Sequence, residues 1–232
     1  MKIVLFDIDG TLVLTGGAGA RAMARAAVDL FGVENADQSI AMAGRTDSWI
    51  VAQMAALVEA PCDPQVIGRF RAVYVRYLLE EIAHPGPKKY LLPGVAEIVA
   101  LLHQRDDVHL GLLTGNFHEG ARIKLEHFGI WPFFHGGAFG DDAEQRPHLF
   151  EIALARIANA GGPVVPPGDV VIVGDTPLDV EVARVAGARS LAVATGPYDV
   201  RALRESGASV VMEDLRDREA VLGAIGLTSG PE

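Results

Sequence analysis

The chain has 232 residues, of which half are hydrophobic and 22% are charged, so it is long enough to bury a substantial core. This composition excludes a disordered tail, a collagen and a disulfide-rich miniprotein. The net charge of -10 gives a surface that repels nucleic acid and anionic membranes, and neither is expected as a partner. The single cysteine, Cys62, cannot form an internal disulfide, and no run is apolar enough for a signal peptide or a membrane span. A cytoplasmic protein is expected.

Strands alternate with helices along most of the chain. Four short, mainly apolar runs predict strands that are buried on both faces, at 3–8, 108–113, 170–173 and 190–194. Between and after them, stretches of helical period lie at 95–102, 119–128, 149–159, 178–186 and 200–205. This alternation predicts an α/β fold: a Rossmann-like parallel sheet with helices on both faces.

The interval from residue 16 to residue 87 breaks the alternation. It contains no convincing strand but three helical segments, at 18–31, 47–59 and 64–83, with Asp47 and Asp63 as expected N-caps. Trp49 and Met54 stand at helical spacing and are expected in the core of this unit. The sequence therefore predicts a small all-helical cap domain at 16–87, inserted after the first strand of a core formed by 1–15 and 88–232.

Two aspartates follow the first predicted strand, in the segment Phe6-Asp7-Ile8-Asp9-Gly10-Thr11. Alternation along a strand puts Asp7 and Asp9 on the same side, at the end of the sheet where parallel sheets bind ligands. Because adjacent carboxylates repel each other, a cation is the natural explanation, and oxygen ligands suit Mg²⁺. The alternative is a turn whose aspartates cap the next helix.

Two further segments end predicted strands with polar residues. Asp175 and Asp179 follow the strand at 170–173, and in a parallel sheet all four aspartates can converge on one site. Thr114, Gly115 and Asn116 follow the strand at 108–113 and precede a helix. This arrangement is typical of phosphate binding through a hydroxyl and backbone N–H groups, although Thr-Gly-Asn is also an ordinary turn.

Taken together, these segments resemble the motifs of the haloacid dehalogenase-like hydrolase superfamily. The first motif matches Asp7-x-Asp9-Gly10-Thr11, the second matches Thr114, and the fourth matches Gly174-Asp175-x-x-x-Asp179. The helical insertion after the first motif resembles the small helical cap of that family. Cap type and chain length are most similar to those of phosphoglycolate phosphatases, with phosphosugar phosphatases close behind.

The third motif departs from the family pattern. Relatives have a Lys followed by Pro and then Phe, where this chain has Arg146-Pro147-His148-Leu149-Phe150. Arginine keeps the positive charge and can grip an anion with two donors, but it is bulkier than lysine. Lys124, on the helix after Thr114, is the rival for this role. It is expected to be a solvated surface charge, so Arg146 is the preferred candidate.

The resemblance implies a magnesium-dependent phosphatase that acts on a small phosphorylated substrate through an aspartyl-phosphate. Asp7 would attack phosphorus, and Asp9 would protonate the leaving alkoxide and then activate water. The implied metal ligands are a carboxylate oxygen of Asp7, the backbone carbonyl of Asp9 and the Asp175 side chain, with Asp179 in the coordination sphere or behind it. Thr114 and Arg146 would hold the phosphoryl oxygens, next to Gly115 and Asn116 of the same phosphate-binding loop.

Several residues are weaker candidates. Arg45, in the loop before the second cap helix, could meet the far end of a substrate or lie in solvent beside an N-cap turn. Arg21 and Arg25 share one face of the first cap helix and are expected to be mainly solvated. His118 follows the Thr114 loop and is expected to be structural or solvated.

Other functions remain open at this stage. A phosphomutase has the same core, whereas the dehalogenase branch carries no acid at the position of Asp9. A non-catalytic protein that binds a phosphorylated ligand, or accepts a phosphate on Asp7, is the alternative from a different class. The physiological substrate and the oligomeric state are not predicted.

Overall fold

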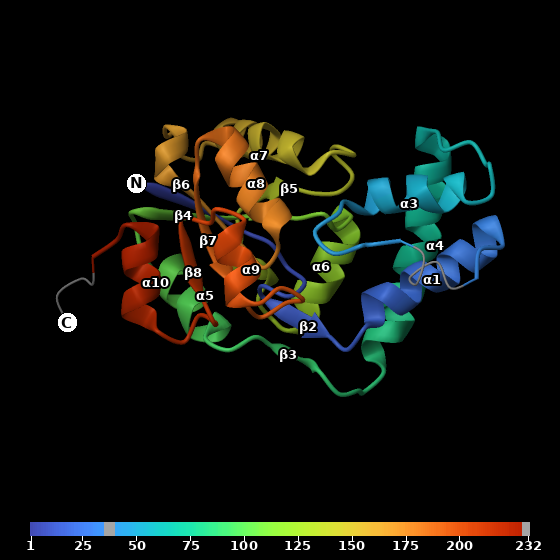
Figure 1. Cartoon of the computed structure of the whole chain (residues 1–232), viewed down its shortest axis with the longest axis horizontal. Helices are drawn as coiled ribbons and strands as arrows, with labels where there is room; N and C mark the ends of the chain where they lie inside the picture. Colours follow the sequence, from blue (N-terminus) through green and yellow to red (C-terminus); the bar gives the residue numbers. More distant parts are fainter. Residues whose placement is uncertain (35–39, 229–232) are drawn as a thin grey trace.

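A six-stranded parallel sheet forms the centre of the computed structural model, which describes residues 1–34 and 40–228 (Figure 1). The strand order is β5-β4-β1-β6-β7-β8. The strands span Lys2–Phe6 (β1), Val108–Leu113 (β4), Gly137–Ala138 (β5), Val170–Gly174 (β6), Arg189–Val193 (β7) and Val210–Met212 (β8). The central strands β1 and β6 are almost entirely buried, as their apolar sequences predict, and only Lys2 at the start of β1 is charged.

Helices cover both faces of this sheet. They span Val95–His103 (α5), His118–His127 (α6), Leu149–Asn159 (α7), Pro177–Ala186 (α8), Val200–Glu205 (α9) and Arg218–Ile225 (α10). Ile3 and Leu5 of β1 pack with buried residues of α7 and α8 on one face, while Val4 and Phe6 pack with α5, α6 and α10 on the other. The predicted fold class, a Rossmann-like parallel sheet covered on both faces, is confirmed.

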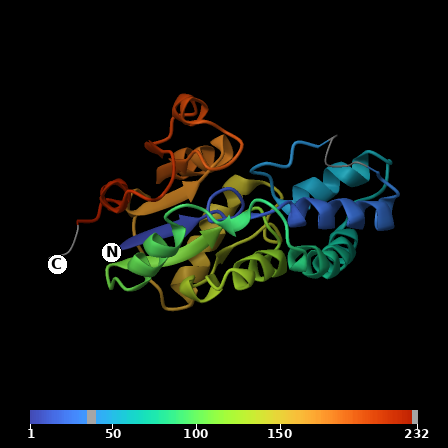
Figure 2. The same cartoon turned by 90° about the horizontal axis from the view of Figure 1, so that it is seen from below.

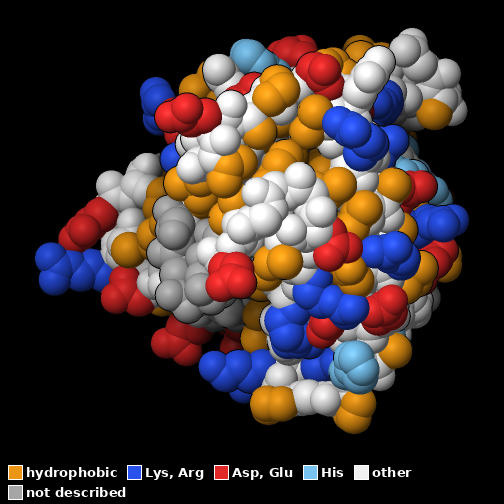
Figure 3. Space-filling model, turned by 90° about the vertical axis from the view of Figure 1, so that its right-hand side faces the viewer, with side chains coloured by type: hydrophobic (Ala, Val, Ile, Leu, Met, Phe, Trp, Pro, Cys, Tyr) orange, Lys and Arg blue, Asp and Glu red, His pale blue; other side chains and the backbone are white. Residues whose placement is uncertain are grey.

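Three helices of the described residues form a separate unit to one side of the sheet (Figures 1 and 2). They span Ala18–Phe31 (α1), Asp47–Ala56 (α3) and Pro64–Ala83 (α4), and they share a hydrophobic cluster that includes Met54 and Phe70. Strands β2 (Val13–Thr15) and β3 (Lys89–Leu91) pair antiparallel where the chain enters and leaves this unit. The division at residues 16 and 87 stays a prediction that this arrangement supports. Figure 3 shows the outer surface of the cap end, where hydrophobic and charged side chains are interspersed.

The local predictions were wrong in a few places. Thr46, and not Asp47, caps α3, because the Thr46 side chain accepts the hydrogen bond from Trp49 N. Helix α3 ends at Ala56, before Glu59 adopts a positive φ of 53°. Asp63 caps α4 as predicted, through a hydrogen bond from Val66 N. Helix α10 and the strands β2, β3, β5 and β8 were not predicted, and each of these strands has only two or three residues.

Candidate active site

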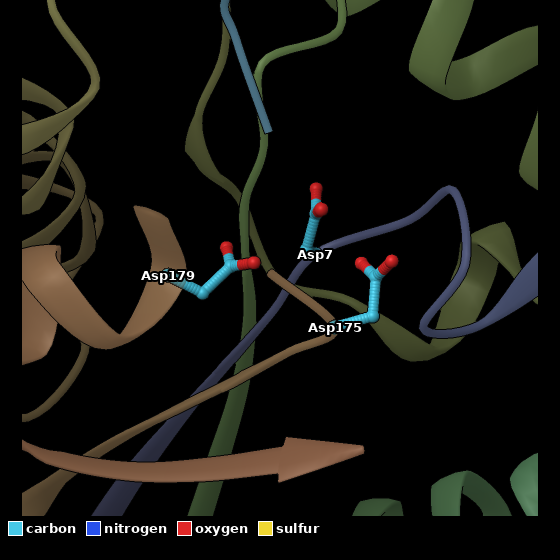
Figure 4. A group of neighbouring side chains, drawn as sticks. All are labelled: Asp7, Asp175 and Asp179. Atoms are coloured by element: carbon cyan, nitrogen blue, oxygen red, sulfur yellow. The ribbon is translucent and has the colours of Figure 1, made fainter. Parts of the chain in front are cut away.

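Three buried carboxylates meet at the carboxyl ends of β1 and β6. Asp7 directly follows β1, Asp175 directly follows β6, and Asp179 lies in the first turn of α8. One oxygen from each of the three lies within 4.8 Å of the others, and Figure 4 shows the side chains grouped together. The strands β1 and β6 are parallel neighbours, so their ends bring two segments that are far apart in sequence to the same edge.

Gly10 allows this close grouping. It has a φ of 79°, which residues with a side chain rarely adopt, and a Cβ at this position would lie 2.3 Å from Asp175 Oδ2. Thr11, the next residue, donates a hydrogen bond from its hydroxyl to Asp175 Oδ1 at 3.1 Å. The Asp-x-Asp-Gly-Thr segment therefore shapes the turn that holds Asp175 beside Asp7.

Arg146 reaches into this group from the segment between β5 and α7. It begins a short 3₁₀ helix, Arg146–His148, that leads into α7, and its side chain is 5% exposed. Its Nη2 lies 3.0 Å from Asp7 Oδ2 and 2.5 Å from Asp179 Oδ1, while its Nη1 donates to Gly44 O of the cap. Within the described residues, its buried Nε has no hydrogen-bond partner. Arg146 thus joins two of the carboxylates to the cap, and its Nε stays without a partner among the described residues.

Asp179 already has protein partners on both oxygens. Oδ1 faces Arg146, and Oδ2 accepts hydrogen bonds from Thr176 N and from the Thr176 hydroxyl in a capping box. Burial raises the pKa of Asp179 to about 6, although the attraction of Arg146 acts in the opposite direction. This arrangement favours a position for Asp179 behind any bound cation, where it orients Arg146.

The surroundings of Asp175 disfavour a negative charge more than those of Asp179 do. Burial raises the pKa of Asp175 well above its usual value, and repulsion from Asp7 and Asp179 raises it further. Within the described residues, Asp175 Oδ2 and Asp7 Oδ1 accept no hydrogen bond from the protein. A pair of free oxygens among buried, mutually repelling carboxylates is suited to a hard cation such as Mg²⁺.

Asp9 lies apart from this trio and has its own partners. Its Oδ2 accepts hydrogen bonds from Lys124 Nζ at 2.5 Å and from Asn116 Nδ2 at 2.9 Å. Asn116 also donates to Thr114 Oγ1 and accepts from Lys124, so its amide connects all three side chains. The carboxylates of the four aspartates therefore do not all converge. Three meet, and the fourth is held by Lys124 and Asn116.

The expectation that Lys124 is a surface charge is wrong. Its side chain is 5% exposed, because α6 directs it inward beneath the cap, where Gly19 and Tyr74 approach it. Burial lowers the pKa of Lys124, but the attraction of Asp9 outweighs this effect and the pKa is raised overall. Sequence reasoning missed the residue although a signal existed: the segment around it is amphipathic, and Lys124 falls next to Ile123 and Leu125 on the buried side of α6.

The loop before α3 attaches the cap to the core. Asp47 N donates to Gly115 O at 2.7 Å, and Asp47 Oδ2 accepts from Phe117 N at 2.8 Å. A Cβ on Gly115 would lie 2.0 Å from Arg45 O, so this close approach requires glycine. Burial raises the pKa of Asp47 to about 7. Asp47 is thus a buried contact between cap and core, and not the helix cap that was predicted.

The weaker candidates fall in different places. The Arg45 side chain is exposed at the edge of the cleft, with its guanidinium 4.6 Å from the centre of the Trp49 ring. Arg21 and Arg25 both form ion pairs with Glu81 of α4, which gives them a structural partner. The backbone N–H of His118 donates to Asp141, and its ring packs against Trp131 and Phe139. It is not among the described residues that line the cleft.

The site opens into a cleft between core and cap with a volume of about 710 Å³. Asp7, Asp9, Asp175 and Arg146 lie on its core side. Gly115 and Asn116 also line it, whereas Thr114 is fully buried beneath them at the end of β4. The structure thus brings the predicted residues of all the motifs to one cleft, with Asp179 and Thr114 in the layer below.

A family profile described as haloacid dehalogenase-like hydrolase matches residues 1–187. The chain belongs to this family. Among its curated relatives, it is 28% identical to a probable phosphatase, IndB, of Dickeya dadantii, over 96% of this chain and 92% of the relative. It is also 28% identical to the phosphoglycolate phosphatase of Escherichia coli K12, over 95% and 92% of the two chains. The predicted enzyme class, a phosphatase-type hydrolase, is confirmed by the family match together with such relatives.

Solved structures of the same fold extend over nearly the whole chain. CbbY from Rhodobacter sphaeroides in complex with phosphate superimposes with a TM-score of 0.73 at 20% identity, covering 98% of this chain and 100% of that chain. A hydrolase from Pseudomonas syringae has a TM-score of 0.71 at 21% identity, covering 99% and 100%. Within the described residues, no helix is long and apolar enough to span a membrane.

Proposed function

We propose that this protein is a magnesium-dependent phosphatase that hydrolyses a small phosphorylated metabolite through an aspartyl-phosphate on Asp7. The observation that carries this proposal is the buried group of Asp7, Asp175 and Asp179 beside the Arg146 guanidinium, at the floor of a cleft that Asp9 also lines. Phosphoryl transfer requires positioning and charge neutralisation, and this group provides both. A cytoplasmic location remains the expectation.

The residues fit Mg²⁺. Asp7 and Asp175 offer free carboxylate oxygens, and the backbone carbonyl of Asp9 is the third ligand that the family resemblance implies. Asp179 would stand behind them, because Arg146 and Thr176 occupy its oxygens. Bound here, the ion would neutralise charge between Asp7 and the phosphate. A rise in melting temperature with Mg²⁺ in the absence of substrate would support this assignment.

Different side chains carry out nucleophilic attack, proton transfer and phosphate binding. Asp7 attacks phosphorus and becomes phosphorylated, while the leaving alkoxide takes a proton from Asp9. Asp9 then takes a proton from the water that hydrolyses the phosphorylated Asp7. Arg146, whose Nη2 lies 3.0 Å from Asp7 Oδ2, brings its positive charge beside the phosphoryl oxygens. Gly115 and Asn116 line the same cleft, with Thr114 in the layer below them.

Lys124 belongs in this scheme as a positioning residue for Asp9. Together with Asn116 it fixes the Asp9 carboxylate from one side, which leaves Asp9 Oδ1 for the leaving group. Because a buried ammonium donates in a low dielectric, this contact constrains Asp9 more firmly than a surface ion pair would.

Three alternative functions are considered, and Asp9 argues against two of them. A dehalogenase needs no acid at position 9, so the held Asp9 carboxylate favours phosphate chemistry. A phosphomutase shares the core and differs in whether a sugar hydroxyl or water accepts the phosphoryl group. A non-catalytic phosphate acceptor has no use for Asp9, which lines the cleft with defined partners.

The test is a panel of phosphorylated metabolites, with phosphoglycolate and sugar phosphates as the first members because of the family resemblance. Steady release of phosphate with Mg²⁺, abolished by a chelator, is the expected result. A single stoichiometric phosphorylation without turnover would favour the phosphate acceptor, and transfer to a second sugar hydroxyl would favour the mutase.

A further inference from the structure

The cleft is large for a substrate as small as phosphoglycolate. Its volume of about 710 Å³ lies in the range of about 300–1,000 Å³ that is typical of pockets for drug-sized ligands. The phosphate group needs only the floor, where Asp7, Asp175 and Arg146 lie. Most of the volume therefore faces the organic part of the substrate.

Apolar side chains form the cap side of this cleft. Met23 comes from α1, Ile50 from α3 and Met42 from the loop between these helices, and Leu14 of β2 also lines the cleft. These four side chains are called the apolar wall below. Met23 and Ile50 are each 4% exposed, so their side chains are held in the cap core while they line the cleft. Methionine side chains adapt to the shape of an apolar group and pack well against aromatic rings.

The size of the cleft does not come from a cap that has swung away from the core. The cap loop is already attached on the core side, through Asp47 to Gly115 and Phe117, and through Gly44 to Arg146. Ser48 Oγ also donates to Gly140 O at 2.5 Å. The volume thus remains with the cap loop in contact with the core.

The positively charged side chains in the cleft either form ion pairs with carboxylates or are exposed to solvent. Arg146 is paired with Asp7 and Asp179, and Lys124 is paired with Asp9. Among the described lining residues, the other cationic side chains are Arg45 and Lys88, and both are exposed to solvent. A second anionic group on the substrate would meet only these solvent-screened charges, whereas an apolar group would meet the side chains of Met23, Met42 and Ile50.

Tyr74 offers one polar contact in the same cleft as the apolar wall. Its side chain is 1% exposed and lines the cleft, and its hydroxyl makes no hydrogen bond with the described residues. A hydroxyl that lines the cleft without a partner among the described residues is available to a single polar atom of the substrate.

We propose that the cleft takes a phosphate monoester whose alcohol carries an apolar chain or ring, in preference to phosphoglycolate or a sugar phosphate. This inference rests on the proposed phosphatase function and specifies its substrate class. The apolar part lies against Met23, Met42 and Ile50, and the phosphate lies over Asp7.

A series of n-alkyl phosphates from ethyl to octyl tests this directly. Their alcohols have nearly the same acidity, so the chemical step stays constant and kcat/KM reports the contact with the alkyl chain. We expect kcat/KM to rise by about fourfold for each added methylene until the alkyl chain covers the apolar wall. Phosphoglycolate and glycerol 3-phosphate should fall below hexyl phosphate.

Matched variants locate the contact. Met42→Gln and Met23→Gln keep the side-chain length but should flatten the dependence on chain length, mainly through KM. Val28→Gln, on the exposed side of α1, serves as the control and should leave the dependence unchanged. Competitive inhibition by ethyl and hexyl phosphonate, which are not hydrolysed, gives the same comparison without turnover.

The possible results separate this inference from the proposed function. If no phosphate ester is hydrolysed, the proposed function fails, while tighter inhibitor binding with chain length would still support the apolar cleft. Hydrolysis of phosphoglycolate or sugar phosphates with no gain along the alkyl series would overturn the substrate class and leave the phosphatase intact. A chain-length dependence that survives both methionine variants would overturn the proposed wall.

Discussion

Lys124 Nζ donates a hydrogen bond to Asp9 Oδ2 over 2.5 Å, from a lysine side chain that is almost fully buried. The two residues are 115 positions apart and meet because β1 and β4 are parallel neighbours, with α6 following β4. A buried cation that contacts the proposed acid and base is placed to affect catalysis. This finding reverses the role that the sequence assigned to Lys124.

Substitution of Lys124 should therefore impair hydrolysis. Lys124→Met leaves Asp9 without its charged partner, and we expect kcat to fall by about tenfold or more, since general acid–base catalysis contributes roughly 10²–10⁴. Lys124→Arg, which keeps the charge, should retain more activity. Arg122→Ala, on the exposed side of the same helix, is the control. Steady-state kinetics with a folded Lys124→Met protein at the wild-type rate would contradict this role.

Arg146 should be still more important, because it contacts the proposed nucleophile itself. Removal of one preorganised donor to developing charge costs about 10²–10³ in kcat, and we expect a loss of this size for Arg146→Ala. Arg146→Lys should recover part of the rate, since it keeps the charge but not the two-pronged geometry. The comparison of kcat for these two variants is the measurement. Equal, near wild-type rates in both would remove Arg146 from the phosphate site.

Asp47 should make the protein less stable as the pH rises. Its pKa is raised to about 7 by burial, so the folded state holds a proton that the unfolded state releases near pH 4. The contribution of Asp47 is fully present below about pH 4 and is lost as the pH rises through about 7. Asp47→Asn should remove this loss, which amounts to at most about 4 kcal/mol.

Urea unfolding of wild type and Asp47→Asn between pH 5 and pH 8 checks this expectation. The difference in unfolding free energy should move in favour of the variant as the pH rises. Asp175 and Asp179 also titrate, but they are present in both proteins and cancel in the comparison. Parallel stability curves would show that Asp47 is ionised throughout this range.

Arg45 should affect which substrates are preferred and not the chemistry. It is exposed at the edge of the cleft above Trp49, away from the carboxylates. We expect Arg45→Ala to raise KM for substrates with a second anionic group, while kcat for p-nitrophenyl phosphate changes little. An equal loss of kcat on every substrate would instead assign Arg45 to the catalytic machinery or to cap structure.

Most of the fold could be predicted because its signals are local. The apolar runs of β1, β4, β6 and β7 and the helical periods between them match the structure to within a few residues. The short strands β5 and β8 depend on pairing with a neighbour and leave no period of their own in the sequence. Thr46 replaced Asp47 as helix cap because Asp47 is taken by a tertiary contact with Phe117.

The positions of the site residues along the chain were predictable, but the contacts that their side chains make depend on tertiary packing. The motifs placed Asp7, Asp175 and Asp179 at strand ends, and the structure brings them together. Helical spacing places Lys124 on the same face of α6 as Ala121 and Leu125, but only tertiary packing brings that face beneath the cap and beside Asp9. The pairing of Asp179 with both Arg146 and Thr176 likewise depends on the approach of two distant segments.

The central claim is that Asp7 attacks phosphorus, and the Asp7→Asn variant tests it most directly. The change is nearly isosteric and leaves the fold intact, but an amide cannot act as the nucleophile. Release of p-nitrophenol from p-nitrophenyl phosphate with Mg²⁺ should be steady for the wild type and absent for Asp7→Asn. Turnover by the purified variant at a rate near that of the wild type would contradict the covalent mechanism.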